Sequence, residues 1–348
     1  MIWLVWRQHR QQVLFALLGL AALAAFMIPT GIQMHAAFDR AGLDDCVPAA
    51  AQVDYLRANP NSNVAPFGAD PSDPVTAQVT LCQEQAGLYA GRLGLYGTVG
   101  ILLWFLPLLA GIFWGAPLVA REVEHGTHRL VWTQGVTRRR WALVKFSLVG
   151  GGLVLVAACY SVLMTWWRAP LDQAAAQRFQ FLLFDLIGIV PIAYTLFAFA
   201  LGTFAGALTR KTQVAGAITL VGFTAARLGV EFLARSHYLA PLRRTYPILV
   251  TKLPNPISGD WLLSSGVYSA QGARVAGGTF TQFVFGGCPP PPAGAQCLAQ
   301  YGGITSYTME VFQPAERFWL FQGIETALFT AVAVGLLLAA VRWARRLT

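Results

Sequence analysis

The sequence has 348 residues, of which 55% are hydrophobic and only 12% are charged. Soluble domains carry roughly 25% charged residues, so this composition, with a mean hydropathy of +0.52, excludes an ordinary soluble protein and indicates a membrane protein. The formal net charge of +9 would suggest nucleic-acid binding in a soluble chain, but in a membrane protein the placement of the charges matters more than their sum.

The first twelve residues combine Trp3 and Trp6 with Arg7 and Arg10. We expect a separate interfacial helix over residues 1–12, with its tryptophans toward lipid and its arginines toward water and anionic headgroups. A cleaved signal peptide is the alternative, because basic residues also precede an apolar run there. The apolar run is long for a signal peptide, which favours the interfacial helix.

Six apolar runs then approach the roughly 20 residues that a helix needs to cross a bilayer. They predict an all-α fold with six transmembrane helices in a single transmembrane domain, at residues 13–34, 95–119, 141–166, 181–208, 214–233 and 318–341. Prolines lie inside the second and fourth runs, at Pro107, Pro117 and Pro191. Membrane helices tolerate proline where neighbouring groups satisfy the freed carbonyls, so we expect kinks there.

Six spans place both termini on one side of the membrane, and the basic residues indicate which side. The short segments on that side are rich in Arg and Lys, whereas the first long loop on the other side is acidic. We therefore expect a multi-pass protein of the plasma (inner) membrane with both termini in the cytoplasm.

Two large extracellular loops are expected, at residues 36–94 and 234–317, and they contain four of the five cysteines. Because outer compartments are oxidising, we expect disulfide bonds there. Of the three possible pairings, the within-loop pairs Cys46–Cys82 and Cys288–Cys297 are the simplest, with free thiols as the alternative. Cys159 falls in the third run and is expected to be an inert buried thiol.

Four ionisable residues lie inside the apolar runs, in the half away from the expected cytoplasm: Asp185, Arg227, Glu231 and Glu325. Each costs about 3 kcal/mol at the bilayer centre on insertion scales, so we expect them to have partners. Arg227 and Glu231 are spaced to pair on one helix face. A polar cluster that ties helices together is the commoner case; an outer gate or the polar lining of a substrate path is the other interpretation.

Common catalytic and nucleotide-binding motifs are missing from the sequence. It contains no G-x-S-x-G elbow, no H-E-x-x-H and no Walker A motif, since none of its lysines follows a glycine. We therefore expect no catalytic residue, no metal site and no cofactor bound by this chain. His125 and His128 have no third ligand nearby, so a solvated or partner-facing pair is expected.

A dense charged segment, REVEHGTHRLVWTQGVTRRRW at residues 121–141, separates the second and third runs. Gly126 can end the second helix, and Thr127 suits the N-cap of a short amphipathic helix that ends at Gly135. Leu130–Trp132 give that helix an apolar patch. A short helix across the cytoplasmic mouth of two membrane helices is typical of a docking lever for a soluble partner.

The same segment resembles the signature region of ABC-2-type permeases, the membrane subunits of type II ABC exporters. The family pattern is an acidic stretch, then G-T, an apolar patch, T-x-(G/P)-V-(S/T)-R and a lysine that opens the third span. The matching positions are Glu122, Glu124, Gly126, Thr127, Leu130–Trp132, Thr133–Arg138 and Lys145. The N-terminal WLVWRQHR resembles the family's interfacial connecting helix, and the six-span topology also fits.

The resemblance implies a permease subunit that forms the substrate path of an ATP-driven exporter. It implies a coupling helix within residues 121–137 that contacts a separate ATPase subunit, which would bind ATP and Mg. The expected contact residues are Glu122, Glu124, Gly126, Thr127, His128, Arg129, Leu130, Val131 and Trp132. A second permease chain would complete a homodimer or heterodimer. The substrate stays open, since the family exports lipids, polysaccharides, drugs and peptides; a secondary transporter or channel without an ATPase is the alternative, and a membrane-embedded enzyme is a weaker one.

Overall fold

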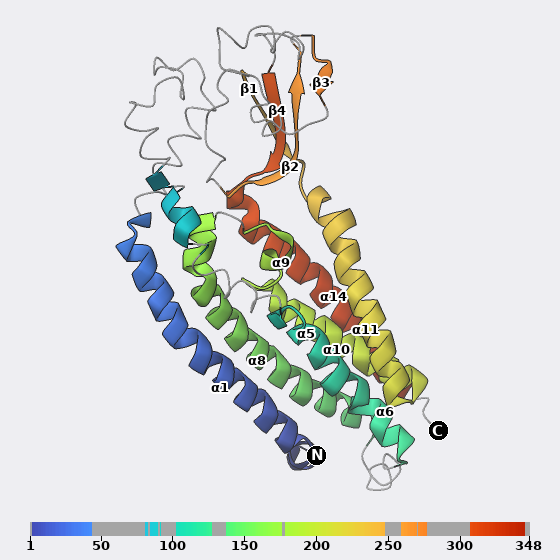
Figure 1. Ribbon diagram of the computed structural model, residues 1–348. Coiled ribbons are helices and arrows are strands. Elements are labelled where there is room, and N and C mark those ends of the chain that lie inside the picture. Colours follow the sequence, from blue (N-terminus) through green and yellow to red (C-terminus); the bar gives the residue numbers. More distant parts are fainter. Residues whose placement is uncertain are drawn as a thin grey trace.

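A bundle of long helices carries a small β-sheet at one end (Figure 1). The computed structural model describes residues 2–43, 81–82, 84–89, 91, 102–126, 137–175, 178–247, 259–269, 271–276 and 307–344. Within these ranges, six helices are long and apolar enough to cross a membrane. The start of the first helix and the end of the last lie together at the end opposite the sheet, as expected for an even number of spans.

Helix α1 runs without a break from Ile2 to Arg40 and packs on α8, which spans Arg138–Ala175. Of the interfacial helix expected at residues 1–12, the described residues from Ile2 onward are not a separate helix: they are continuous with the first span. The physical reason is that the stretch RQHRQQ contains neither glycine nor proline, so nothing ends the helix before the apolar run begins.

The second span consists of α5 (Leu106–Ala110), a π-helical turn η2 (Gly111–Gly115) and α6 (Ala116–Glu124). Pro107 and Pro117 lie in the first turns of α5 and α6, where a missing backbone N–H is least costly. The π-turn between them absorbs the interruption of the helical hydrogen bonds. The span thus ends five residues later than the expected position 119, and the expected residues 95–101 are outside the described part of the chain.

The fourth run is not one helix from 181 to 208, as the sequence suggested. The short α9 (Phe181–Phe184) stops at Asp185, and α10 (Val190–Thr209) begins after a non-helical turn. Gly188 in this turn has φ +73°, a conformation that costs glycine little, and Pro191 lies in the first turn of α10. Non-helical backbone at membrane depth is tolerated only where protein surrounds it, and here neighbouring helices enclose it.

The fifth span is longer than expected at the sheet end, and the sixth begins where it was expected. Helix α11 (Thr212–Gly229) continues through a π-turn η3 (Val230–Ala234) and a 3₁₀ turn η4 (Arg235–His237). Helix α14 (Phe318–Ala344) follows the 3₁₀ turn η6 (Ala315–Arg317). Helix α10 lies at the centre of the bundle, in contact with α14, α11, α8 and the second span.

Helix α10 approaches the second span so closely that only glycine fits at the contact. A Cβ atom on Gly202 would lie 2.5 Å from the carbonyl oxygen of Gly111 and 2.7 Å from the backbone nitrogen of Ala116. A Cβ on Gly206 would lie 2.5 Å from the carbonyl oxygen of Ala116. Small residues four positions apart commonly allow such backbone contact between membrane helices.

The loop expected at 234–317 contains a four-stranded antiparallel sheet, so the all-α fold class is wrong for this region. Its strands are β1 (Leu242–Pro247), β2 (Trp261–Tyr268), β3 (Arg274–Ala276) and β4 (Tyr307–Gln313), in the order β1-β4-β2-β3. Arg244 on β1 bonds Glu310 on β4 at 2.7 Å and Asp260 at 3.0 Å. Windows of 20 apolar residues detect membrane helices and miss strands this short.

The other large loop is described only in part. Tyr89 donates a hydrogen bond of 2.9 Å to the carbonyl oxygen of Met34, and burial raises the pKa of this tyrosine to about 12. Cys82 is disulfide-bonded, with its partner outside the described residues. The pairings Cys46–Cys82 and Cys288–Cys297 therefore stay predictions. The expectation of a buried thiol at Cys159 is wrong, because that side chain points outward from α8 and is exposed.

Candidate functional site

Five charged side chains meet inside the half of the bundle nearer the sheet, and we call them the charge cluster: Asp185, Arg227, Glu231, Arg235 and Glu325. They come from the turn after α9, from α11 with its continuation, and from α14. Arg235 and Glu325 have no exposed surface in the chain, and Arg227 is only 2% exposed. The four ionisable residues singled out in the sequence thus lie together, joined by an arginine that the sequence interpretation missed.

Asp185 lies between the two arginines. Its Oδ2 is 2.5 Å from Nη2 of Arg227, and its Oδ1 is 2.6 Å from Nη2 of Arg235. The expected ion pair between Arg227 and Glu231 is wrong, because Glu231 pairs with Arg235, one turn further along. The i, i+4 spacing offered Glu231 an arginine on either side, and the fold gives one of them to Asp185.

Arg235 is the hub of the cluster. Its Nε donates to Oε2 of Glu325 at 2.9 Å, and its Nη2 donates to Oε1 of the same carboxylate at 2.8 Å. This two-point geometry suits a guanidinium group and a carboxylate, and it fixes both side chains. Together with Asp185 and Glu231, Arg235 contacts three carboxylates that arise from different segments.

Neutral donors bind the same carboxylate oxygens as the arginines. Tyr194 donates to Glu325, and its hydroxyl lies 3.1 Å from Oδ1 of Asp185. Tyr238 donates to Oε2 of Glu325 at 3.3 Å; burial and then the charge of Glu325 raise the pKa of Tyr238, which keeps its phenol a donor. Trp104 donates from Nε1 to Asp185 at 3.3 Å. Asp185 and Glu325 thus each accept hydrogen bonds from several donors, whereas Glu231 is held by its ion pair with Arg235.

Aromatic rings complete the enclosure. The guanidinium carbon of Arg227 lies 3.8 Å from the ring centroid of Trp104 and 4.3 Å from that of Tyr194. That of Arg235 lies 4.0 Å from the ring centroid of Phe184. Such cation–π contacts are strongest away from water, and they replace part of the hydration that the arginines lose.

Helices α8 and α14 fix the turn that carries Asp185. Oε1 of Gln322 accepts hydrogen bonds of 3.0 Å from the backbone nitrogens of Ile189 and Val190, and its Nε2 donates to the carbonyl oxygen of Phe184 at 2.8 Å. From α8, Ser161 donates to the carbonyl oxygen of Gly188 and Thr165 accepts from its backbone nitrogen. These bonds satisfy the backbone groups exposed by the break, so neighbouring helices stabilise the break.

The cluster therefore works as a lock between helices. It is closed to solvent within one chain, and removing one partner of a buried pair typically costs about 3–5 kcal/mol. Burial favours the structural interpretation over the lining of an open path. Within the described ranges, no three His, Cys, Asp or Glu side chains are arranged to hold a metal ion.

Other contributors went unnoticed in the sequence. The sequence gives no indication that the polar residues Tyr194, Tyr238 and Gln322 belong to a shared cluster. Arg235 follows Glu231 by four residues, and extending the fifth span by one turn would have found it.

A second polar set lies at the opposite end of the bundle, where α6 ends. Oε1 of Glu122 is 2.5 Å from Nζ of Lys145 on α8, and Oε2 of Glu124 is 2.9 Å from Oγ1 of Thr212 on α11. Gly126 has φ +69°, which suits a glycine just past a helix end. The expected contact residues Thr127, His128, Arg129, Leu130, Val131 and Trp132 lie outside the described residues.

One comparison with known proteins identifies a relationship. The family model described as "ABC-2 membrane transporter related" matches residues 17–235, which include most of α1, the next four membrane spans almost to their end and most of the charge cluster. Neither a curated protein nor a solved structure matches the chain.

Proposed function

The chain belongs to the ABC-2 membrane transporter related family, and from this premise we propose that it is the permease subunit of an ATP-driven exporter. In this proposal a separate ATPase subunit binds ATP and Mg, and a second permease chain completes the substrate path. The membrane is the plasma (inner) membrane, with both termini and the segment 121–137 in the cytoplasm.

The observation that carries the proposal is that the α6 end of the segment 121–137 is anchored to two other membrane helices. Glu122 joins α6 to α8 through Lys145, and Glu124 joins α6 to α11 through Thr212. The segment itself leads from α6 into α8. A partner that pushes on this segment would therefore act on three membrane helices at once, as a coupling element must.

Helix α11 offers a mechanical connection from this end to the charge cluster. Its first residue, Thr212, bonds Glu124, and Arg235 in its continuation is the hub of the cluster. At 1.5 Å per residue, the two positions are about 35 Å apart along the helix. A rigid helix between two fixed points transmits a displacement, so docking at one end would strain the lock at the other.

The test is binding and coupling to a candidate ATPase encoded beside this protein. Leu130→Asp or Trp132→Asp should abolish co-purification with the ATPase and transport-coupled ATP hydrolysis, while membrane insertion stays normal. The matched control is Leu262→Asp, on the exposed side of β2 at the other end of the molecule. Full coupling in both cytoplasmic variants would show that the ATPase does not dock on this segment.

The charge cluster is the observation that favours the alternative, a transporter driven by an ion gradient. Buried acids in a membrane protein can mark ion or proton pathways. Reconstitution of the purified chain in liposomes decides between the two: an exporter subunit moves substrate only with the ATPase and ATP present. Transport driven by an imposed ion gradient alone would establish the alternative.

A further inference from the structure

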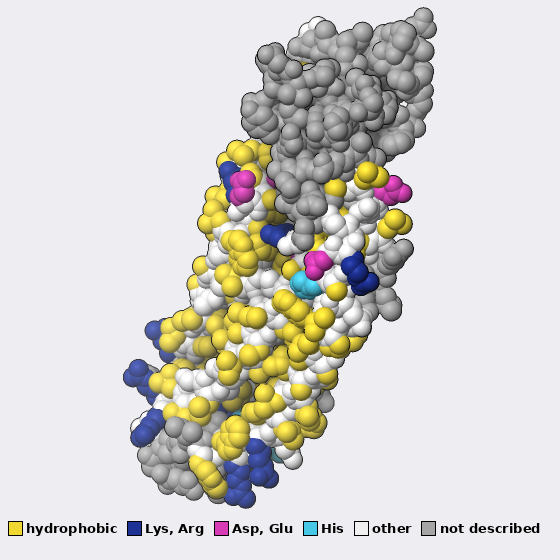
Figure 2. Space-filling model, turned by 90° about the vertical axis from the view of Figure 1, so that its left-hand side faces the viewer, with side chains coloured by type: hydrophobic (Ala, Val, Ile, Leu, Met, Phe, Trp, Pro, Cys, Tyr) yellow, Lys and Arg dark blue, Asp and Glu magenta, His cyan; other side chains and the backbone are white. Residues whose placement is uncertain are grey.

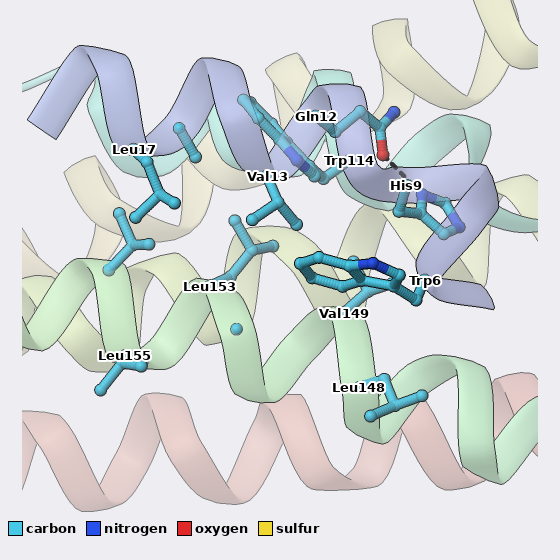
Figure 3. A pocket seen from close by; sticks show the side chains of 13 residues that line it. Trp6, His9, Gln12, Val13, Leu17, Trp114, Leu148, Val149, Leu153 and Leu155 are labelled. Atoms are coloured by element: carbon cyan, nitrogen blue, oxygen red, sulfur yellow. Dashed lines mark hydrogen bonds between the residues drawn. The ribbon is translucent and has the colours of Figure 1, made fainter. Parts of the chain in front are cut away.

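An apolar groove runs along the bundle between α1 and the second span, with α8 as its floor. It consists of two adjoining cavities of about 490 and 440 Å³ that share Ala16, Trp114, Leu153 and Val156. Figure 3 shows the first of them, with side chains of α1 facing those of α8 across the opening. Apart from its polar end and Thr195, the groove is lined by hydrocarbon and aromatic side chains and by glycine.

The groove is open because glycines line it where other residues would project side chains. Gly19 on α1 and Gly152 on α8 both belong to its walls. A Cβ atom added to either one would meet no other atom within 4 Å. Protein interiors are normally close-packed. An unfilled apolar groove that faces a bilayer can therefore accept another apolar group, such as a lipid chain.

The length of the groove suits a lipid chain. Its wall on α1 extends from Trp6 to Leu23, which is about 25 Å at 1.5 Å per residue. One leaflet contributes about half of the roughly 30 Å hydrocarbon core. The groove is thus longer than one leaflet is deep, so a lipid chain that enters from the headgroup level has room to lie along it.

The end of the groove opposite the sheet is polar and mostly basic. It opens into a third cavity of about 430 Å³, which shares His9, Gln12 and Trp114 with the groove. Arg121 and Lys145 also line this cavity, where Glu122 is the acidic residue. Nε2 of His9 is buried and has no hydrogen-bond partner among the described residues, while its Nδ1 contacts Gln12 at 2.5 Å.

The surface around this end has the same sign of charge. Figure 2 shows Lys and Arg side chains gathered at the lower end of the molecule, below a wide apolar belt. Arg121 has an exposed side chain there. Basic residues at headgroup level attract anionic lipids. The site thus combines an apolar slot with a cationic mouth.

We propose that this groove is a binding site for an anionic phospholipid. One acyl chain lies between α1 and α8, and the phosphate lies at the polar end near Arg121, since Lys145 is already paired with Glu122 there. The inference is independent of the proposed function, since it requires neither an ATPase nor a transport substrate.

The experiment uses the purified full-length chain, stripped of lipid and then exposed to phosphatidylglycerol or phosphatidylcholine in mixed micelles. Native mass spectrometry counts the lipid molecules that stay bound. The wild type should retain phosphatidylglycerol in preference to phosphatidylcholine. Gly152→Phe fills the groove and should reduce retention at least fivefold, whereas Arg121→Gln should reduce the preference for the anionic lipid several-fold.

The neighbouring glycine supplies the matched control. Gly151 also has no atom within 4 Å of an added Cβ, but it does not line the groove, so Gly151→Phe should retain lipid as the wild type does. If Gly152→Phe does not fold, Ala16→Phe fills the groove from the opposite wall. Equal retention in filled and control variants, no preference for the anionic lipid, or a groove covered by a second copy, seen as a disulfide between two Leu155→Cys chains in native membranes, would each overturn the proposal.

Discussion

Nη2 of Arg227 lies 2.5 Å from Oδ2 of Asp185, although the two residues are 42 positions apart in the sequence. The contact exists because the fourth apolar run breaks after α9 and turns Asp185 into the bundle. Each side chain thereby gains a charged partner in place of the water that it would lose inside a membrane. The pair, with Arg235 and Glu325, joins the turn after α9 to α11 and α14.

The first prediction concerns this pair. Arg227→Met should lower the free energy of unfolding by about 3–5 kcal/mol, because it leaves a buried carboxylate with one fewer partner. In a double-mutant cycle with Asp185→Asn, the two changes should couple by about 0.5–3 kcal/mol. Chemical or thermal denaturation of each purified variant in detergent measures its free energy of unfolding, and the four values complete the cycle.

Glu231 supplies the control for that cycle. It has the i, i+4 spacing to Arg227 but pairs with Arg235. Arg227→Met combined with Glu231→Gln should therefore show a clearly smaller coupling than Arg227→Met with Asp185→Asn. The reverse order of the two couplings would contradict the arrangement of the cluster.

The second prediction concerns the hub. Arg235→Lys keeps the positive charge but cannot contact three carboxylates with two parallel hydrogen bonds to one of them. Each lost hydrogen bond to a charged group is worth about 1.5–3 kcal/mol, so the variant should unfold at a markedly lower temperature. Arg243→Lys, on the exposed side of β1, is the matched control and should unfold like the wild type. A thermal shift as small for Arg235→Lys as for the control would show that the two-point contact is unimportant.

The sequence predicts the membrane helices well because their signal is local. A run of about 20 apolar residues is sufficient to identify a span, whatever surrounds it. The apolar run placed the end of the second span five residues too early, whereas Gly126, which the sequence offered as a helix end, does lie just past the end of α6. The sheet was not visible on the same scale, because β2 is eight residues long and lies in a loop read only for its length.

The pairing inside the charge cluster is not a local property. Spacing showed that Arg227 can reach Glu231, but it could not show that Asp185 competes for the same arginine. That depends on the break at Gly188, and glycine or proline in an apolar run also occurs in unbroken membrane helices. The break becomes predictable only when Gln322 on another helix is known to bond the exposed backbone groups.

The third prediction concerns that glutamine. Gln322→Leu leaves the nitrogens of Ile189 and Val190 and the carbonyl oxygen of Phe184 without a partner, at a cost of about 1–3 kcal/mol for each buried group. Amide hydrogen exchange at Ile189 and Val190 should become faster, and the melting temperature should fall. Gln213→Leu on the exposed side of α11 is the control. Unchanged exchange in Gln322→Leu would mean that the break does not depend on this side chain.

The fourth prediction concerns the contact between α10 and the second span. Gly202→Ala should destabilise the protein by about 1–3 kcal/mol, because the new Cβ meets backbone atoms that cannot move aside. Gly229→Ala on α11 meets nothing within 4 Å, so it should be neutral or stabilising by up to about 1 kcal/mol from helix propensity. Opposite signs for the same substitution are the expected result. A destabilisation of both variants by the same amount would indicate an effect of backbone flexibility and not of packing.

The last prediction concerns Cys82, which is disulfide-bonded to a partner outside the described residues. We predict that the partner is Cys46, because both fall in the same loop between the first two spans. Peptide mapping of unreduced membranes should recover a Cys46–Cys82 peptide pair, while Cys159, a free thiol within the third span, should be alkylated in the same sample once the membranes are dissolved in SDS. Cys46→Ser should then free Cys82 for alkylation and lower the melting temperature, since such crosslinks typically stabilise by about 2–4 kcal/mol. Recovery of Cys82 linked to Cys288 or Cys297 would instead show that the disulfide joins the two large loops to each other.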